Sequence, residues 1–140
     1  MNAIIICTIV HSVGDVVRIF KTKLFVKFGR RERIADPTLT DAVDRAEKGQ
    51  VDAYLGGGVI KQRVARAGQG RSGGYRTLIA YRSGSLAVFM FGFAKNEMDN
   101  IDDKQLATLQ DSAAAWLEAN DAQIAKARAD GLLLEVKDGK

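Results

Sequence analysis

The sequence predicts one α+β domain whose sheet is largely antiparallel. Three strand-like runs follow one another between residues 59 and 94, and segments with helical spacing of apolar residues stand before and after them. The chain has 140 residues, which is enough for one hydrophobic core and too few for two ordinary domains.

The start of the chain is expected to supply a strand and a first helix. Residues 16–20 have strand character, and the apolar run at residues 3–10 is either a further strand or an extension. Residues 23–33 place apolar side chains at helical spacing. They also carry arginines near their C-terminal end, where the helix dipole favours cations.

A second helix is expected after a break. Asp36 and Pro37 interrupt the chain, because proline is a poor residue inside a helix. Thr40 then has a side chain suited to an N-cap for a helix over residues 41–48, and Gly49 is a C-terminal stop. The two helices would form an N-terminal helical hairpin.

The middle of the chain is expected to form three strands. Residues 59–66 alternate apolar with cationic side chains, so one face can be buried while the other carries charge. Residues 75–82 are rich in aromatic and β-branched residues, and Ser83 with Gly84 forms a turn. The nearly apolar residues 86–94 belong in the middle of a sheet.

The end of the chain is expected to cover this sheet. Residues 102–119 form an amphipathic helix with Trp116 in its apolar stripe, so we expect Trp116 in the core. Residues 122–129 are a further helical stretch that ends at Gly131. Residues 132–136 are short and apolar, and would add an edge strand or pack on the core.

Basic residues are concentrated in the middle of the chain. The net charge is only +4, but residues 53–96 carry seven basic residues and no acid, whereas residues 97–140 carry five basic and ten acidic residues. Because solvated surfaces usually mix both signs, this block indicates a polyanionic partner, and we expect nucleic acid. No amphipathic basic helix favours a membrane surface.

Composition excludes several other classes. One cysteine and one histidine cannot form an internal disulfide framework or a Cys/His zinc cluster within one chain, and we expect neither a metal nor a cofactor. We expect Cys7 to be a buried apolar residue and His11 to be structural or exposed. Since neither a membrane-length apolar run nor a secretory signal is recognisable, we expect a cytoplasmic protein.

Residues 68–73 match the dinucleotide-binding pattern G-x-G-x-x-G. The dinucleotide-binding pattern needs a helix after it, whereas here a strand is expected. A kinase-type glycine loop does lie between strands, but the other sequence motifs of a kinase are missing. We therefore expect a flexible hairpin loop whose glycines permit positive φ. Its Arg71 and Ser72 could still contact phosphate.

A group of cations is expected on one side of the sheet. Lys61 and Arg63 stand two residues apart on one strand and share a face, which Arg76 can join from the next strand. Lys95 stands at the end of the third strand. Such cations can hold a phosphodiester, and the alternative is a solvated sheet face.

A cluster of this kind suits RNA, which carries its own nucleophile. A metal-free enzyme needs to take the proton of the 2′-OH, stabilise the phosphorane and protonate the leaving 5′-oxygen. Arginine suits the second task, and a lysine surrounded by cations can serve the first. The expected RNA-binding residues are Arg66, Arg71, Ser72, Tyr75 and Asn96. Of these, Tyr75 is either a stacking residue or part of the packing.

Three ordered blocks resemble the RelE/HigB branch of type II toxin–antitoxin toxins. They are Gly-Gly-Val-Ile-Lys61-Gln-Arg63-Val-Ala, Gly-Arg71-Ser72-Gly73-Gly74-Tyr75-Arg76 and Gly92-Phe-Ala-Lys95-Asn96-Glu97. The similarity extends from about Arg18 to the Leu-Leu-Leu-Glu-Val tail. It implies a RelE-like toxin domain over residues 18–140, a small sheet packed by helices, and leaves residues 1–17 as an extension of unknown role.

The resemblance also implies an activity and partners. RelE-type toxins are mRNA interferases that cut messenger RNA on the ribosome, and their antitoxins often bind DNA, so we expect a helix-turn-helix antitoxin. Lys61 and Arg63 take the positions of the paired basic residues, and Arg76 that of the phosphate-stabilising arginine. RelE has an arginine that is often assigned as general acid, and this sequence has Asn96 at that position. Lys95, beside it, is therefore the candidate proton donor. The C-terminal catalytic tyrosine has no match.

Two other functions stay open at this stage. A ParE-like relative would poison DNA gyrase by binding it, without RNA chemistry. A non-catalytic RNA-binding protein would use the same cations for binding alone. The clustered cations favour cleavage over gyrase binding, because a gyrase poison needs no face that holds phosphate.

Overall fold

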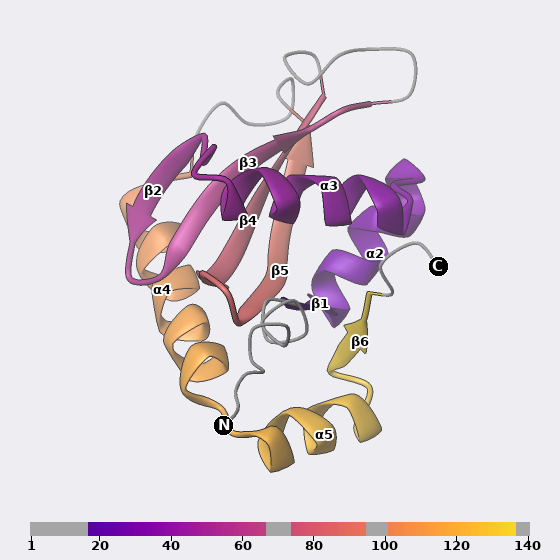
Figure 1. The fold of residues 1–140 in the computed structure, drawn as a ribbon, viewed down its shortest axis with the longest axis vertical. Helices are drawn as coiled ribbons and strands as arrows, with labels where there is room; N and C mark the ends of the chain where they lie inside the picture. Colours follow the sequence, from indigo (N-terminus) through magenta and orange to yellow (C-terminus); the bar gives the residue numbers. More distant parts are fainter. Residues whose placement is uncertain (1–16, 67–73, 95–100, 137–140) are drawn as a thin grey trace, which may run out of the picture.

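The computed structural model describes residues 17–66, 74–94 and 101–136. They form one six-stranded sheet in the order β2-β3-β4-β5-β1-β6, with four helices around it (Figure 1). The strands are β1 (Arg18–Thr22), β2 (Ala53–Gly56), β3 (Val59–Val64), β4 (Tyr75–Arg82), β5 (Leu86–Ala94) and β6 (Leu133–Glu135). The helices are α2 (Lys23–Glu32), α3 (Asp36–Glu47), α4 (Asp103–Glu118) and α5 (Asp121–Ala129).

The predicted α+β class and the mostly antiparallel sheet are confirmed. Only the β1–β5 pair is parallel among the described strands, and the other four pairs are antiparallel. The apolar run at β5 lies between β4 and β1, in the interior of the sheet as expected. Because helices cover both faces there, its residues are buried on both faces, with the exception of the half-buried Phe91.

The two faces of the sheet bury separate hydrophobic layers. Phe25 of α2 and Val43 of α3 pack in the layer on one face. Ala113 of α4 and Ile124 of α5 pack in the layer on the other. We refer to these as the α3 face and the α4 face. α2 and α3 follow each other on one face, and the prediction that they pack together as a hairpin stays a prediction.

The start of α3 corrects one prediction. Thr40 does not cap this helix but lies inside it, and its hydroxyl donates to the Asp36 carbonyl oxygen. Pro37 stands in the first turn, where its missing N–H is not needed and its fixed φ favours the helix. The helix therefore begins at Asp36, five residues earlier than the predicted residue 41.

A short edge strand, β2, was not predicted. It joins β3 through a two-residue turn of Gly57 and Gly58, whose φ values of 63° and 83° match a type I′ hairpin. A Cβ atom at Gly58 would lie 2.5 Å from Cδ1 of Leu117, so the bare backbone also lets α4 approach. With only four residues, β2 shows too little alternation to be recognised.

Both C-terminal helices begin with the same capping box. The side chains of Asp102 and Asn120 accept from the backbone N–H of Gln105 and Gln123, whose own side chains accept from the cap N–H. Trp116, which was expected in the core, is half-buried and packs against the hydrophobic layer of the α4 face. β6 pairs with β1 at the edge of the sheet, which matches the first of the two alternatives for residues 132–136.

No helix among the described residues combines the length and the apolar composition needed to cross a membrane. Within the same residues, no group of three or more His, Cys, Asp or Glu side chains is placed to hold a metal ion. The predictions for the apolar run at residues 3–10, for Cys7 and for His11 lie outside the described residues.

Candidate active site

The sheet register brings three of the predicted site residues together. Arg63 of β3 is paired directly opposite Arg76 of β4, and Lys61 is paired with Leu78, two residues along. Paired residues of an antiparallel sheet point to the same face, with Cβ atoms about 4.5–5.5 Å apart. Lys61, Arg63 and Arg76 therefore form one cluster, which we call the cation cluster.

The cation cluster lies on the α4 face. Leu78, the partner of Lys61, belongs to the hydrophobic layer of that face, as does Phe93, the partner of Arg76. α4 contacts this side of the sheet at its β2–β3 edge, where Gln110 donates to the Leu55 carbonyl oxygen at 3.0 Å. All three cations are only partly buried, so an anion can reach them.

Lys61 and Arg76 have no carboxylate partner among the described residues. The basic side chains that do form ion pairs there are Arg18, Lys21, Arg31, Arg45, Arg63, Lys126 and Arg128. Arg76 makes a long hydrogen bond to the Gly74 carbonyl oxygen, at 3.5 Å. Like charges directly opposite each other destabilise a sheet, so this arrangement costs stability that a bound anion would recover.

Arg63 is held from the sheet edge by Asp52. The Asp52 carboxylate accepts from the Arg63 backbone N–H at 2.7 Å and from its Nη2 at 3.3 Å. Burial raises the pKa of Asp52, but the hydrogen bonds from Arg63 outweigh this and hold the pKa below its usual 3.8. Because a guanidinium has five N–H donors, Arg63 keeps donors for a second anion.

Gln62 and Arg45 fix the position of Arg63 from the α3 side of the sheet. Gln62 is fully buried on the α3 face, where its Oε1 accepts from the Asp52 N–H at 2.8 Å and its Nε2 donates to the Ala42 carbonyl at 2.9 Å. Arg45 of α3 donates to the Arg63 carbonyl oxygen at 2.7 Å. These links join α3, the start of β2 and β3, and so set the position of Arg63.

Sequence reasoning missed all three supporting residues. A weak signal was present for two of them, because Gln62 is a polar residue at an apolar position of the β3 alternation, and Asp52 is the last acid before the basic block. No such signal marks Arg45, whose hydrogen bond to the Arg63 carbonyl oxygen joins residues 18 positions apart. Its role depends on how α3 packs against the sheet.

Arg66 and Tyr75 lie apart from the cation cluster. Tyr75 is 3% exposed in the layer of the α3 face, donates to Glu32 at 2.9 Å and meets the Phe28 ring edge-on at 5.5 Å. The Arg66 guanidinium lies over the Tyr75 ring, 5.3 Å from its centre. This placement matches the packing alternative for Tyr75, since base stacking needs an exposed ring and this one is buried.

The other predicted site residues are not part of the described structure. They are Arg71, Ser72, Lys95 and Asn96, together with the glycine loop at residues 68–73. One more cation of the basic block, Arg82, lies at the far end of β4, where its guanidinium donates to the Leu117 carbonyl oxygen. Arg82 is therefore separate from the cation cluster.

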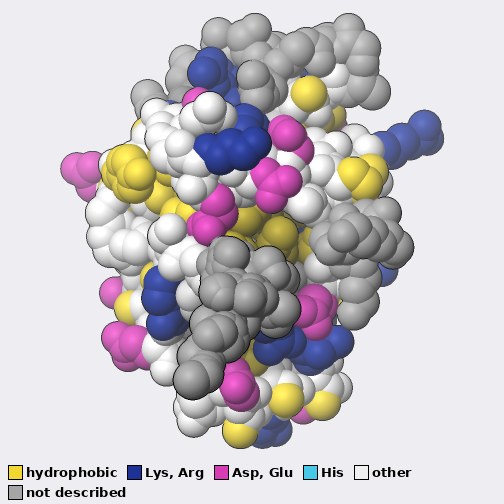
Figure 2. All heavy atoms as spheres, in the orientation of Figure 1, with side chains coloured by type: hydrophobic (Ala, Val, Ile, Leu, Met, Phe, Trp, Pro, Cys, Tyr) yellow, Lys and Arg dark blue, Asp and Glu magenta, His cyan; other side chains and the backbone are white. Residues whose placement is uncertain are grey.

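The α3 face has a different charge pattern. Figure 2 shows the molecule with α3 in front of the sheet, and basic and acidic side chains are interspersed on this side. Ion pairs join Arg45 to Asp41 at 3.2 Å and Lys21 to Asp36 at 2.9 Å. Such mixing is typical of a solvated surface, and it contrasts with the uncompensated charge of Lys61 and Arg76.

Replacing Asp52 with asparagine is expected to lower the free energy of unfolding at neutral pH by about 1 kcal/mol, because the pair with Arg63 is partly screened by solvent. Since the folded pKa of Asp52 is lowered, its contribution is complete above the usual pKa of 3.8 and is lost as the pH falls through the folded value. Urea unfolding of both proteins at a series of pH values checks this. The two stabilities should converge in acid, and a difference that stays constant with pH would contradict the assignment.

The fold and the site together define a class: a small α+β protein whose sheet carries a cation cluster suited to phosphate, in which Lys61 and Arg76 have no carboxylate partner among the described residues. A family model described as the RelE toxin of the RelE/RelB toxin–antitoxin system matches residues 17–136. The chain therefore belongs to the RelE toxin family. Toxins of this family are generally endoribonucleases, and membership implies a RelB-type antitoxin as partner. A search of curated proteins found no match to the chain.

Proposed function

We propose that this toxin is a ribosome-dependent endoribonuclease, an mRNA interferase that cuts messenger RNA by attack of the 2′-OH on the adjacent phosphate. The observation that supports this most is the register that sets Arg63 opposite Arg76, with Lys61 on the same face. Because RNA supplies its own nucleophile, a face that binds phosphate and moves protons is sufficient for the reaction without a metal.

Each residue of the cluster has a role in this proposal. Arg76 and Arg63 donate to the non-bridging phosphate oxygens and stabilise the charge of the phosphorane. Lys61, in its unprotonated amine form, accepts the proton of the 2′-OH as the new O–P bond forms. Lys95, outside the described residues, donates a proton to the 5′-oxygen as the old P–O bond breaks. The products are a 2′,3′-cyclic phosphate and a 5′-hydroxyl.

The partners follow from the same proposal. The ribosome positions the messenger RNA and sets the positions at which it is cut. The cognate antitoxin is a helix-turn-helix DNA-binding protein that blocks growth arrest in the cytoplasm by covering the cation cluster or by competing with the ribosome. Residues 18–140 act as the toxin domain, and residues 1–17 are an extension outside it.

Primer extension on translated messenger RNA after induction of the toxin tests the proposal. We expect cuts at codons in the ribosomal A site. Accumulated cleaved DNA complexes without RNA cuts would instead identify a ParE-like gyrase poison. Binding to RNA with neither kind of damage would identify a non-catalytic RNA-binding protein.

A further inference from the structure

A cavity lies on the α4 face, where its lining residue Phe91 stands two positions along β5 from Phe93, the residue paired with Arg76. It has a volume of about 300 Å³ and opens between the start of α4 and β5. Its lining residues are Phe91, Ile101, Lys104, Gln105, Thr108 and Leu109. The lining is mostly apolar and includes one aromatic ring, and the volume is at the lower end of the range for small-molecule sites in proteins.

The sheet register places the cavity within one nucleotide of the proposed phosphate position. Phe91 is paired with Leu78, and the next residue on the same face of β5, Phe93, is paired with Arg76. Phe91 is therefore the diagonal neighbour of Arg76, and such neighbours lie about 7–8 Å apart. A nucleotide whose phosphate is bound by Arg76 can reach Phe91 with its base.

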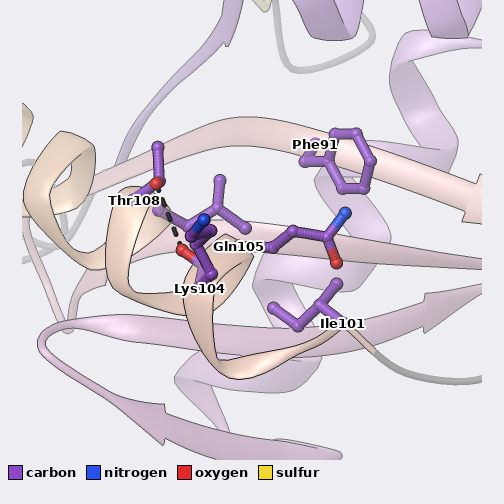
Figure 3. A pocket seen from close by; sticks show the side chains of 6 residues that line it. Phe91, Ile101, Lys104, Gln105 and Thr108 are labelled. Atoms are coloured by element: carbon purple, nitrogen blue, oxygen red, sulfur yellow. Dashed lines mark hydrogen bonds between the residues drawn. The ribbon is translucent and has the colours of Figure 1, made fainter.

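Two of the polar side chains that line the cavity, Gln105 and Lys104, have N–H groups to donate. The Oε1 of Gln105 accepts from the Asp102 N–H at 3.0 Å to complete the capping box, so its Nε2 is left to donate. Figure 3 shows the Gln105 side chain extending between Phe91 and Ile101. Lys104 is a further donor, and the Thr108 hydroxyl already donates to the Lys104 carbonyl oxygen at 3.2 Å.

We propose that this cavity binds one nucleobase of the RNA, stacked on Phe91, with an acceptor edge of the base facing Gln105 and Lys104. The inference rests on the proposed function for the presence of RNA at the cation cluster. Guanine fits this donor set best, because its O6 and N7 are two adjacent acceptors, whereas adenine presents a donor beside N7. The reach from Arg76 favours an RNA base over a protein segment as the occupant.

Two matched variants test the subsite. Gln105→Glu keeps the oxygen that caps α4 but removes the amide donors, and Gln123→Glu makes the same change in the identical capping box of α5. The probes are RNA hexamers with 2′-O-methyl groups, which block cleavage, and one central guanine or adenine. We expect the wild type and Gln123→Glu to bind the guanine probe about tenfold more tightly than the adenine probe, and Gln105→Glu to lose that preference.

A second variant tests the stacking ring. Phe91→Leu keeps an apolar wall but removes the aromatic face, and we expect it to weaken binding of the guanine probe roughly tenfold, within the range known for base stacking. Far-UV circular dichroism of all variants checks that each one folds.

Three results would overturn the subsite. The first is equal binding of both probes by the wild type, and the second is the same guanine preference in Gln105→Glu and Gln123→Glu. The third is a Gln105→Glu variant that loses only antitoxin binding, because this result would assign the cavity to a protein segment. The proposed function fails separately. If A-site cuts are missing but the guanine preference depends on Gln105, the proposed cleavage reaction is wrong and the subsite stands. If A-site cuts are found but Gln105→Glu keeps the guanine preference, the subsite is wrong and the proposed function stands.

Discussion

Replacing Arg76 with alanine is expected to lower the rate of messenger RNA cleavage by about 10²–10³-fold, the loss typical of removing one donor that stabilises a charged transition state. The fold should be retained, because Arg76 is only partly buried and has no carboxylate partner among the described residues. Cleavage by purified toxin on translating ribosomes measures the rate, and urea unfolding measures the stability.

Arg82→Ala is the matched control for this variant. Arg82 is on the same strand as Arg76, six residues away and on the same face, and its removal changes the net charge equally. Its guanidinium contacts the end of α4 rather than the cation cluster, so near wild-type cleavage is expected. An Arg76→Ala protein that folds and cleaves at the wild-type rate would refute the role of Arg76 in cleavage. Equal losses of cleavage rate in both variants would show that the effect comes from the overall charge.

Replacing Gly74 with alanine is expected to destabilise the protein by about 3 kcal/mol or more, at the upper end for single substitutions. A Cβ atom at Gly74 would lie 2.0 Å from the Val64 carbonyl oxygen and 3.0 Å from the Arg66 nitrogen. Both are backbone atoms of the neighbouring chain segment and cannot rotate away. The β3–β4 ladder must therefore open close to the Arg63–Arg76 pair, and cleavage should fall with stability.

Gly84→Ala separates this clash from the general effect of losing a glycine. Gly84 has a φ of 73° but no atom within 4 Å of an added Cβ, so the substitution costs only the strain of a positive φ, roughly 1 kcal/mol. Urea unfolding of both variants gives the comparison. A Gly74→Ala protein as stable as Gly84→Ala would show that the two strands are not packed as described.

The alternation of side chains along a strand explains why the shared face of Lys61 and Arg63 could be predicted and why Tyr75 lies away from them. Because side chains alternate across a strand, Lys61 and Arg63 had to share a face, and this was predicted from their spacing. The same rule separates Tyr75 from Arg76, which are adjacent on β4 and so point to opposite faces. Tyr75 was considered for base stacking because of its neighbours in sequence, and the structure buries it on the α3 face.

The remaining features depend on contacts between distant segments. The pairing of Arg63 with Arg76 requires the register of β3 against β4, which strand composition alone does not specify. The hydrogen bonds between Arg63 and Asp52 depend on the position of β2, a strand that is too short to be recognised from its sequence pattern. Thr40 shows the converse case, in which a good capping residue is overridden by a proline three positions earlier that fits the first turn.

A double-mutant cycle of Arg63→Ala and Arg76→Ala in ribosome-dependent cleavage tests most directly whether the two arginines bind the same phosphate. Side chains that act on one group are coupled, so the loss of rate in the double variant should be clearly smaller than the product of the two single losses. Single losses that multiply in full would show that the two arginines act independently and would contradict a shared phosphate site.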